Sequence, residues 1–489
     1  MNIKRVTYFA LAAFAFAASC SKEAAEPNVY DWADGKIYFK TSLSDVAYSR
    51  AQDMTLDRLE SFQVTCFNTA DRYTDQAGFL SPYFENATFI RNVNSGLGTY
   101  VSSPAEEPRD WPSNNGFLRF FAFSPSLSVM TDVNTALEAT DNKEYFNLIN
   151  STTQLQSSVN IGYRLGKVRI NPDILHQFDF VTAEAAGTRL NDFMGGVELA
   201  FSHKLCQVEL KAWGASEDYN FEIAGVRIGN PVVEGTFVFA DDADKASAGR
   251  WDSGNQPVMD RVEYIYRGDK ASGAETEPSV GDRIFRINSQ EHSSMEMAAS
   301  IMGQGGCAMV IPTVNDRWEA LADPNIGATP YSTDRMYFSI LMRVTDKGNG
   351  SVIYPYSGKN NGMVVISYAV DSSGNIVRQL YAGQAEGSYF YDPELQQPYV
   401  AAEGEEIKDF GWAAVPVDAD WSAGKKYIYT LDYSAGIGLH DPADTDPGKP
   451  IGGKSPISWG VTVSGWDNAT PDGDEYTPDL DVPGKGDKK

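Results

Sequence analysis

The sequence predicts an all-β protein built from two antiparallel β-sandwich domains, with long inserted loops and few short helices. Most apolar stretches alternate with polar residues at a period of two, which is the pattern of half-buried strands. Long polar connections, at 98–115, 240–256 and 268–282, separate these stretches. Helical signals are confined to 293–302 and 315–323. Strands joined by turns, with so little helix, favour antiparallel sandwiches.

Strands are expected wherever the alternation is clearest. Those segments are 35–43, 59–67, 117–123, 178–185, 197–213, 221–228, 235–240, 425–433 and 456–466. A hairpin is expected where the alternation of 366–370 meets the turn residues 371–375. The buried parity changes within 197–213, so a bulge is expected between residues 205 and 208. His203 lies on the apolar face there and is expected to be hydrogen-bonded and half-buried rather than a ligand.

The N-terminus has the pattern of an export signal. A basic start, MNIKR, precedes the apolar run 6–18 and then Ser19-Cys20. The run is shorter than the roughly 20 residues that a membrane-spanning helix needs. Ala17-Ala18-Ser19-Cys20 resembles the lipobox of bacterial lipoproteins, in which the cysteine is acylated and becomes the N-terminus. The sequence therefore predicts a signal peptide over 1–19 and lipidation of Cys20; an ordinary signal with a chance cysteine is the alternative.

Composition narrows the possible functions. Sixty-six acidic against 40 basic residues give a formal net charge of −26, which would repel a nucleic-acid backbone. The cysteines other than Cys20 are widely spaced and odd in number, so they predict neither a disulfide framework nor a zinc site. No nucleophile motif and no HExxH zinc motif occurs. We therefore expect no enzyme activity, no cofactor, no metal and no nucleic-acid partner.

The segment GKPIGGKS, residues 448–455, fits the P-loop pattern at every position. A P-loop needs a buried strand before it and a helix after it, because the helix N-terminus holds the phosphates. An acidic, proline-containing stretch precedes this segment, and Pro456 with a β-patterned run follows it. It is therefore expected to be a glycine-rich connector. The acidic clusters 441–446 and 472–475 lack EF-hand spacing and are expected to be solvated loops, with weak calcium binding left open.

Several motifs, taken in order, resemble the fimbrillin family, the lipoprotein-derived pilins of type V pili in Gram-negative anaerobes. The lipobox comes first, and the arginine-containing VAYSRAQD follows the first strand. The other motifs are KIYFKTSL, LESFQVTCF, YFENATFI, DWPSNNGFLRFFAFSP, FDFVTAEA, LAFSHKLCQVEL, YIYTLDY and SWGVTVSGW. The chain departs from the family in its length, its inserts around 240–330 and its tail beyond Trp466. Whether it is a shaft, accessory, tip or anchor subunit stays open.

The resemblance implies transthyretin-like sandwiches and a non-enzymatic assembly mechanism. The lipidated precursor is exported through the periplasm to the outer membrane, and a maturation protease cuts after an arginine. The cut removes the first strand, and a strand from a neighbouring subunit, in a homo- or hetero-polymer, fills the groove. The pili then bind host or bacterial surface ligands.

Carried onto this chain, the cut lies between Arg50 and Ala51, and the removed strand contains Ile37, Phe39 and Thr41. Arg58 is a poorer site because it is closer to the next strand. The donor strand is expected within 456–466, where Ile457, Trp459, Val461 and Val463 alternate; closure of the C-terminal sandwich is an equal alternative. The expected divisions are the signal 1–19, the propeptide 20–50, the sandwich domains 51–190 and 191–466, and a disordered acidic tail 467–489.

A surface-anchored glycan-binding lipoprotein made of β-sandwiches is the alternative function. Tryptophans can stack on sugars, and three of the nine tryptophans lie near polar loops: Trp251, Trp412 and Trp421. This alternative requires their rings to be accessible.

Overall fold

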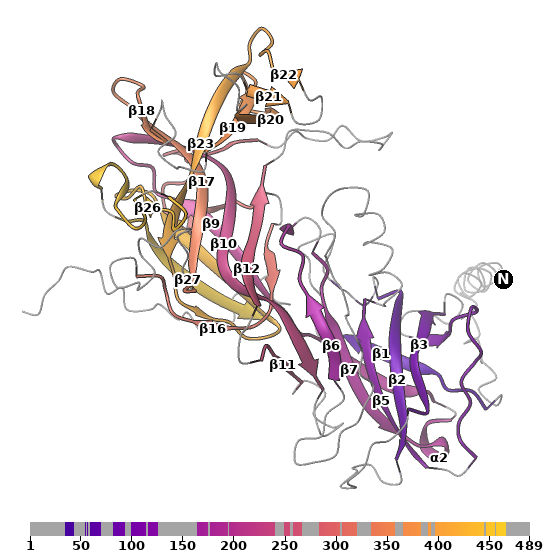
Figure 1. Ribbon diagram of the computed structural model, residues 1–489. Coiled ribbons are helices and arrows are strands. Elements are labelled where there is room, and N and C mark those ends of the chain that lie inside the picture. The colour runs from indigo at the N-terminus through magenta and orange to yellow at the C-terminus, as the bar shows by residue number, and fades with distance from the viewer. Residues whose placement is uncertain are drawn as a thin grey trace, which may run out of the picture.

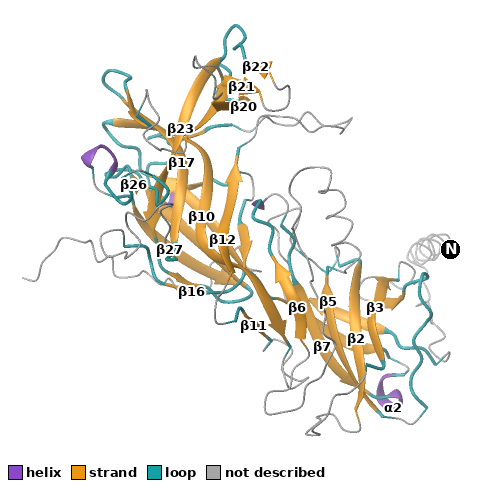
Figure 2. Ribbon diagram, viewed as in Figure 1, coloured by secondary structure: helices purple, strands orange, loops and turns teal. Residues whose placement is uncertain are grey.

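The computed structural model arranges the chain as two β-rich units joined along one long strand (Figure 1). The residues that it describes are 35–43, 54, 56, 59–69, 82–92, 99–113, 116–125, 164–174, 177–193, 195–239, 249–254, 258–266, 283–303, 306–319, 334–356, 365–382, 390–392, 397–444, 446–454 and 456–465. Strands dominate both units, as Figure 2 shows, so the all-β prediction is confirmed. Helices among these residues are limited to α2 (Arg189–Asp192) and short 3-10 turns that include Met295–Met297 and Ile451–Gly453.

The first unit is a closed barrel with the strand order β1-β4-β3-β2-β5-β7-β8. Its strands are β1 (Phe39–Leu43), β2 (Ser61–Thr69), β3 (Phe84–Arg91), β4 (Thr99–Ser102), β5 (Phe117–Ser124), β7 (Val181–Gly187) and β8 (Val197–His203). All neighbours are antiparallel except β1 and β8, which run parallel. Two of the ladders that close the barrel are short: β1 pairs with β4 at Phe39 and Lys40, and β7 pairs with β8 at Val181 and Thr182.

The barrel interior is filled by the apolar parity of each strand. In β8, Val197, Leu199 and Phe201 are buried and alternate with exposed or half-buried residues. Strand β5 differs, because seven of its eight residues are buried. Phe120 faces the barrel core, whereas Phe121 packs in a separate cluster outside the barrel. The continuous apolar sequence of β5 is therefore explained by cover on both faces.

The second unit is a sandwich of two sheets. Its larger sheet contains β6 (Arg164–Arg169), β10 (Tyr219–Val238), β11 (Arg250–Asp252), β12 (Val258–Ile265), β13 (Phe285–Arg286), β17 (Tyr337–Asp346), β18 (Val352–Tyr354), β19 (Val365–Val370), β20 (Ile376–Ala382), β21 (Phe390–Asp392), β22 (Gln397–Pro398), β23 (Glu406–Pro416) and β26 (Leu439–His440). Its smaller sheet contains β9 (Cys206–Trp213), β14 (Ala299–Ser300), β15 (Ala308–Val310), β25 (Lys425–Asp432) and β27 (Ser458–Gly465). A small separate ladder pairs β16 (Val314–Asn315) with β24 (Ala419–Asp420). One apolar core, with residues such as Leu210, Ile223 and Ile340, lies between the two sheets.

Strand β10 joins the two units. Its first half pairs with β17 and β12 in the sandwich, and its second half pairs with β6 and β11 beside the barrel (Figure 1). Aromatic rings pack together at this junction. The ring centroid of Phe237 lies 5.7 Å from that of Phe180 and 5.4 Å from that of Trp251. The buried ion pair between Arg119 and Glu184, at 3.5 Å, belongs to the same side of the barrel.

Several expectations need correction. The segment 197–213 does not bulge: β8 ends at His203 in the barrel, and β9 starts at Cys206 in the sandwich. A domain boundary after residue 190 would place β8 in the wrong unit, and the chain changes sheets at 204–205 instead. The strands expected at 221–228 and 235–240 are one strand, β10, whose register shifts near Asn230, which has a φ of 62°.

The helix expected at 293–302 is a 3-10 turn followed by a strand, and 314–315 is a strand rather than a helix start. The hairpin at 365–382 is confirmed. Within the described part of the chain, no helix has the length and apolar character needed to cross a membrane.

Candidate functional site: the slot filled by strand β1

Strand β1 occupies a slot between β4 and β8. It pairs antiparallel with β4, where Phe39 faces Tyr100, and parallel with β8 over its whole length, from Phe39 opposite Val197 to Leu43 opposite Phe201. In the barrel order, β1 is the strand that connects β4 to β8. Taking β1 away would therefore leave two strand edges without their partners.

The inward side chains of β1 and of the residues before it form one row. Ile37 and Phe39 are fully buried, Thr41 is 9% exposed and Leu43 is half-buried against the same core. The predicted inward set Ile37, Phe39 and Thr41 thus lies where the alternation places it. Burying one large apolar side chain stabilises a fold by about 1.5–3 kcal/mol, so this row contributes strongly to the barrel.

Phe39 is the centre of the row. Its ring meets three others edge-on, with centroid distances of 5.9 Å to Phe62, 4.6 Å to Phe89 and 5.2 Å to Phe120. Edge-to-face contacts of this kind add to the area term. The pocket for Phe39 is therefore shaped by rings from β2, β3 and β5, and it stays apolar if β1 leaves.

Polar contacts fix the ends of the row. The backbone N–H of Ile37 donates to the carbonyl of Arg109 at 2.7 Å, and the N–H of Val197 donates to the carbonyl of Tyr38 at 2.9 Å. Lys36 forms an exposed ion pair with Asp110 at 2.7 Å. Such exposed pairs stabilise little, so apolar burial and the backbone ladder are what hold β1.

The residues predicted to be lipidated or cut are Cys20, Arg50 and Ala51. They lie outside the described residues, as does the tail 467–489.

His203 is described and is only 4% exposed, with its Nδ1 2.7 Å from Asp179 Oδ2. It is hydrogen-bonded as expected, but it is buried rather than half-buried. The sequence motifs that contain Asp179 and His203 are thus brought together by the barrel.

The candidate donor residues lie on β27, at an edge of the smaller sheet, except Ile457, which directly precedes it. All eight residues of β27 pair with β25, and its other edge has no partner among the described strands. Ile457 is 4% exposed, whereas Trp459, Val461 and Val463 are half-buried against the sandwich core. The Trp459 ring donates from Nε1 to the carbonyl of Pro416 at 3.0 Å. In this structure β27 closes its own sandwich.

The tryptophans of the glycan-binding alternative are largely inaccessible. Trp412 and Trp421 are each 2% exposed. The guanidinium of Arg227 covers the Trp412 ring at 3.9 Å from its centroid. Trp251 is half-buried in the aromatic junction and donates from Nε1 to the carbonyl of Lys204 at 2.5 Å. Trp412 and Trp421 therefore offer no open face of the kind that stacking on a sugar requires, and the Trp251 ring is partly covered by Phe180 and Phe237.

The glycine-rich connector and the acidic loop before it fold over the larger sheet. The prediction that 448–455 is no P-loop is confirmed in its described part, since the segment contains only the 3-10 turn Ile451–Gly453 and the next element is β27. The loop 441–446 is not simply solvated, because Asp441 is 3% and Asp444 8% exposed. Asp441 accepts from Ser339, and Asp444 Oδ2 lies 2.8 Å from His440 Nδ1. The burial of these two aspartates was not predicted, because acidic residues in a sequence are usually exposed. No set of three or more potential metal ligands is grouped among the described residues.

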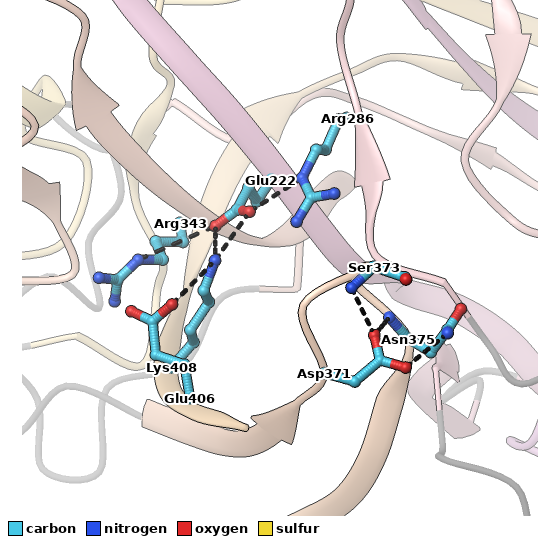
Figure 3. A network of polar contacts seen from close by, with 8 residues as sticks. All are labelled: Glu222, Arg286, Arg343, Asp371, Ser373, Asn375, Glu406 and Lys408. Atoms are coloured by element: carbon cyan, nitrogen blue, oxygen red, sulfur yellow. Dashed lines mark hydrogen bonds and ion pairs between the residues drawn. The ribbon is translucent and has the colours of Figure 1, made fainter. Parts of the chain in front are cut away.

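A charged network that the sequence did not indicate lies on the larger sheet (Figure 3). Glu222 of β10 binds Arg286 of β13 at 3.0 Å and Lys408 of β23 at 3.1 Å, and Arg343 of β17 lies 3.9 Å away. Beside it, the Asn375 side chain and nearby backbone groups donate to the Asp371 carboxylate and lower its pKa. The partners of Glu222 are distant in sequence, so only strand pairing brings them together. The network connects four strands and has no reactive group in its centre.

A comparison with protein-family models agrees with the motifs. Residues 49–276 match the model of a family described as fimbrillin-like. Among solved structures, a fimbrial protein from Bacteroides vulgatus aligns over 88% of this chain and 99% of its own, with 13% identity and a TM-score of 0.45. The fimbrial anchor protein Mfa2 from Porphyromonas gingivalis aligns over 65% of this chain and 80% of its own, with 11% identity and a TM-score of 0.23. No curated protein matches the sequence. Residues 49–276 of this chain are therefore similar to the fimbrillin-like family.

Proposed function

We propose that the protein is a non-enzymatic structural and adhesive subunit of surface pili, assembled by removal of β1 and insertion of a strand from a neighbouring subunit. The observation that carries this proposal is that one short strand closes an otherwise complete barrel. The match of residues 49–276 to the fimbrillin-like family model supports a fimbrial role. The position of the subunit in the pilus and its adhesion ligand are left open.

Removal of β1 would leave a binding site made for a strand. Backbone groups of β4 and β8 would lose their partners, and the pockets of Ile37, Phe39, Thr41 and Leu43 would open to water. Unpaired edges beside apolar pockets favour addition of an extended segment. With about 1.5–3 kcal/mol for each large apolar side chain that is buried again, the inserted strand would be held tightly.

The processing steps are proposed to occur in the order in which their sites lie along the chain. Cys20 is acylated during export through the periplasm, and the lipid holds the precursor at the outer membrane. A protease then cuts between Arg50 and Ala51, which frees both the lipid-bearing segment and β1. The geometry supports this site because the cut lies between β1, which must leave, and β2, which belongs to the barrel that remains.

The donor is proposed to be β27 of a second subunit. The row Ile457, Trp459, Val461 and Val463 matches the row Ile37, Phe39, Thr41 and Leu43 position by position in shape: aliphatic, aromatic, β-branched and aliphatic. Because β27 is paired on one edge only among the described strands, moving it breaks one described ladder rather than two. In this register Val461 takes the place of Thr41, opposite Leu199 of β8.

The register can be tested with a disulfide between subunits. Leu199→Cys and Val461→Cys, introduced together, should form intermolecular disulfides in assembled protein. Leu199→Cys paired with Thr462→Cys, whose side chain points to the other face, is the matched control. Crosslinking that is equal in both pairs would reject this register.

The first experiment on the function is to determine the N-terminus of the protein recovered from the cell surface. A start at Ala51, in material that forms a ladder of polymers resistant to mild denaturant, supports a polymerising pilin. A start at acylated Cys20 with residues 37–43 retained, in a monomer, would contradict the proposal and leave a permanently anchored lipoprotein.

A further inference from the structure

The backbone that follows β1 is fixed to the barrel at Met54. Its N–H donates to Asp179 Oδ2 at 3.1 Å, and the same carboxylate oxygen lies 2.7 Å from Nδ1 of His203. Asp179 is fully buried and His203 nearly so. The Met54 side chain also packs on the barrel core. A buried carboxylate that binds a backbone N–H and is itself held by a buried imidazole is a strong point of attachment.

A second attachment follows within a few residues. Nη2 of Arg91 donates to the carbonyls of Leu56 and Leu59, the latter at 2.8 Å. The hydroxyl of Tyr100 also donates to the carbonyl of Leu59. The Leu59 side chain is fully buried in the barrel core. The backbone on either side of position 58 is therefore bonded to β3 and β4 before β2 begins.

We propose that Asp179, oriented by His203, and Arg91 clamp Met54, Leu56 and Leu59 to the barrel and so confine arginine-specific trimming to the chain N-terminal of Met54. The clamp explains how an arginine-specific protease can distinguish Arg50 from Arg58. Both offer the same side chain, but Arg58 lies in sequence between Leu56 and Leu59, whose backbone is held, whereas Arg50 precedes Met54. This inference rests on the proposed removal of β1 and adds the residues that set its limit.

The physical reason is the way proteases bind their substrates. Cleavage needs several residues of extended backbone to leave their own partners and enter the protease, so its rate follows the population of the locally open form. Opening the chain at Leu56 and Leu59, which flank Arg58 in the sequence, would break the bonds of Arg91 and expose Leu59. Opening before Met54 breaks none of the contacts of the clamp. Asp179, His203 and Arg91 are thus positioning residues for the cut and take no part in its chemistry.

The clamp also protects the slot. A cut after Arg58 would separate the segment that carries Met54 from the barrel. It would make Leu59 the new N-terminus, next to Tyr100 of β4. Because β4 is one wall of the slot, loss of this segment would loosen the wall that an incoming strand must pair with. A limit at Met54 keeps the groove rigid while β1 is removed.

The test is limited digestion of the folded full-length chain with an arginine-specific endoprotease, with the new N-termini followed by mass spectrometry. In the natural protein we expect Ala51 to appear as an N-terminus and Leu59 to appear at least about tenfold more slowly, because local opening limits the second cut. Arg91→Met and Asp179→Ala should each speed the appearance of Leu59 by about tenfold. Asp179→Asn, which keeps an acceptor for the Met54 N–H, should restore most of the protection.

Arg189→Met is the matched control, since it removes an arginine of the same barrel that stacks on Phe193 of the α2 turn. It should leave the ratio of the two cuts unchanged. Equal rates at Arg50 and Arg58 in the natural protein would overturn the proposal, as would clamp variants that remain folded with an unchanged ratio. If a clamp variant fails to fold, hydrogen exchange decides, because rapid exchange of the Met54 amide in the natural protein would also overturn it.

The outcome is separable from the function proposed above. Polymer formation is assayed independently, so a chain that is cut only at Arg50 but never polymerises would keep the clamp and contradict the pilus subunit. Polymers made from chains cut at both sites would contradict the clamp and support the pilus subunit.

Discussion

Strands β1 and β27 carry similar rows of side chains, but the molecule holds them differently. β1 is paired on both edges and places Phe39 among three other rings in a closed barrel. β27 is paired on one edge, and Trp459, Val461 and Val463 stay half-buried. The strand proposed to leave is thus the more tightly held one, and the strand proposed to move to a neighbour is the looser one.

Under the proposed mechanism, this difference would explain why proteolysis precedes assembly. A strand held by two ladders and a buried aromatic ring would not exchange freely, so the uncut precursor is expected to stay a monomer. Once the peptide link is cut, β1 would no longer be tethered to the barrel and could be replaced by a strand whose local concentration is higher. The half-buried strand β27 would supply such a strand at a lower local cost.

The largest effect is expected at the centre of the slot. Phe39→Ala in the uncleaved protein should lower the free energy of unfolding of the barrel by about 3–5 kcal/mol, because it leaves a cavity among Phe62, Phe89 and Phe120. Urea unfolding followed by near-ultraviolet circular dichroism measures this. Lys40→Ala, on the exposed face of the same strand, should change stability by at most about 0.5 kcal/mol. Similar effects for the two would remove the basis for the slot.

The next effect lies at the junction between barrel and sandwich. Burial lowers the pKa of Lys204 from 10.5 to about 8, although the nearby Glu184 opposes this shift. Below pH 8 the amine is charged in the folded and unfolded chain, so the full cost of burying the charge applies. Between about pH 8 and 10.5 the folded chain loses the proton first, so stability should rise with pH.

Lys204→Met should therefore stabilise the protein at pH 7 by about 2–3 kcal/mol and flatten the rise between pH 8 and 10. Unfolding at several pH values checks this, with the half-exposed Lys211→Met as the control. A variant that is less stable than the natural protein at pH 7 would show that the Lys204 charge supports the junction instead.

A smaller effect is expected on β27. Trp459→Ala should cost the monomer about 2 kcal/mol, less than Phe39→Ala, because the ring is only half-buried. It should nevertheless prevent assembly of cleaved protein, since Trp459 would then be missing from the Phe39 pocket. Trp459→Phe should assemble at least as well as the natural chain, because the pocket was filled by phenylalanine. Normal polymers from Trp459→Ala would exclude β27 as the donor.

The smallest effect is expected in the network of the larger sheet. Glu222→Gln leaves Arg286, Arg343 and Lys408 without their shared carboxylate and should cost about 1 kcal/mol, less at high salt. Thermal unfolding at two ionic strengths measures it. Glu406→Gln, in which the carboxylate is 65% exposed, is the control and should have little effect. Equal, salt-independent costs would mean that charge is not what connects these strands.

The sequence predicted the faces of strands better than their partners. A period of two identified Ile37, Phe39 and Thr41 as inward residues, because alternation depends only on local geometry. It could not show that β1 runs parallel to β8, nor that 197–213 divides between two sheets at Lys204 and Leu205. Those features depend on pairing between segments that are far apart in the chain. For the same reason the Glu222 network and the burial of Asp441 had no signal in the sequence.

The clamp formed by Asp179, His203 and Arg91 could be predicted only in part from the sequence. The sequence marked the motifs that contain Asp179 and His203, and the closed barrel brings the two side chains together. Their shared contact with Met54 could not be read from either motif, because it depends on the path of the chain between β1 and β2.

The most direct test of the central claim is a competition for the slot. The chain cut after Arg50 is mixed with a synthetic peptide of residues 35–43, and polymer ladders are followed by electrophoresis. The account predicts that the peptide blocks assembly by restoring the closed barrel, whereas the same peptide with Phe39→Asp does not. Assembly that is unaffected by the peptide, or that proceeds equally in uncut protein, would contradict the claim that subunits join through the slot of β1.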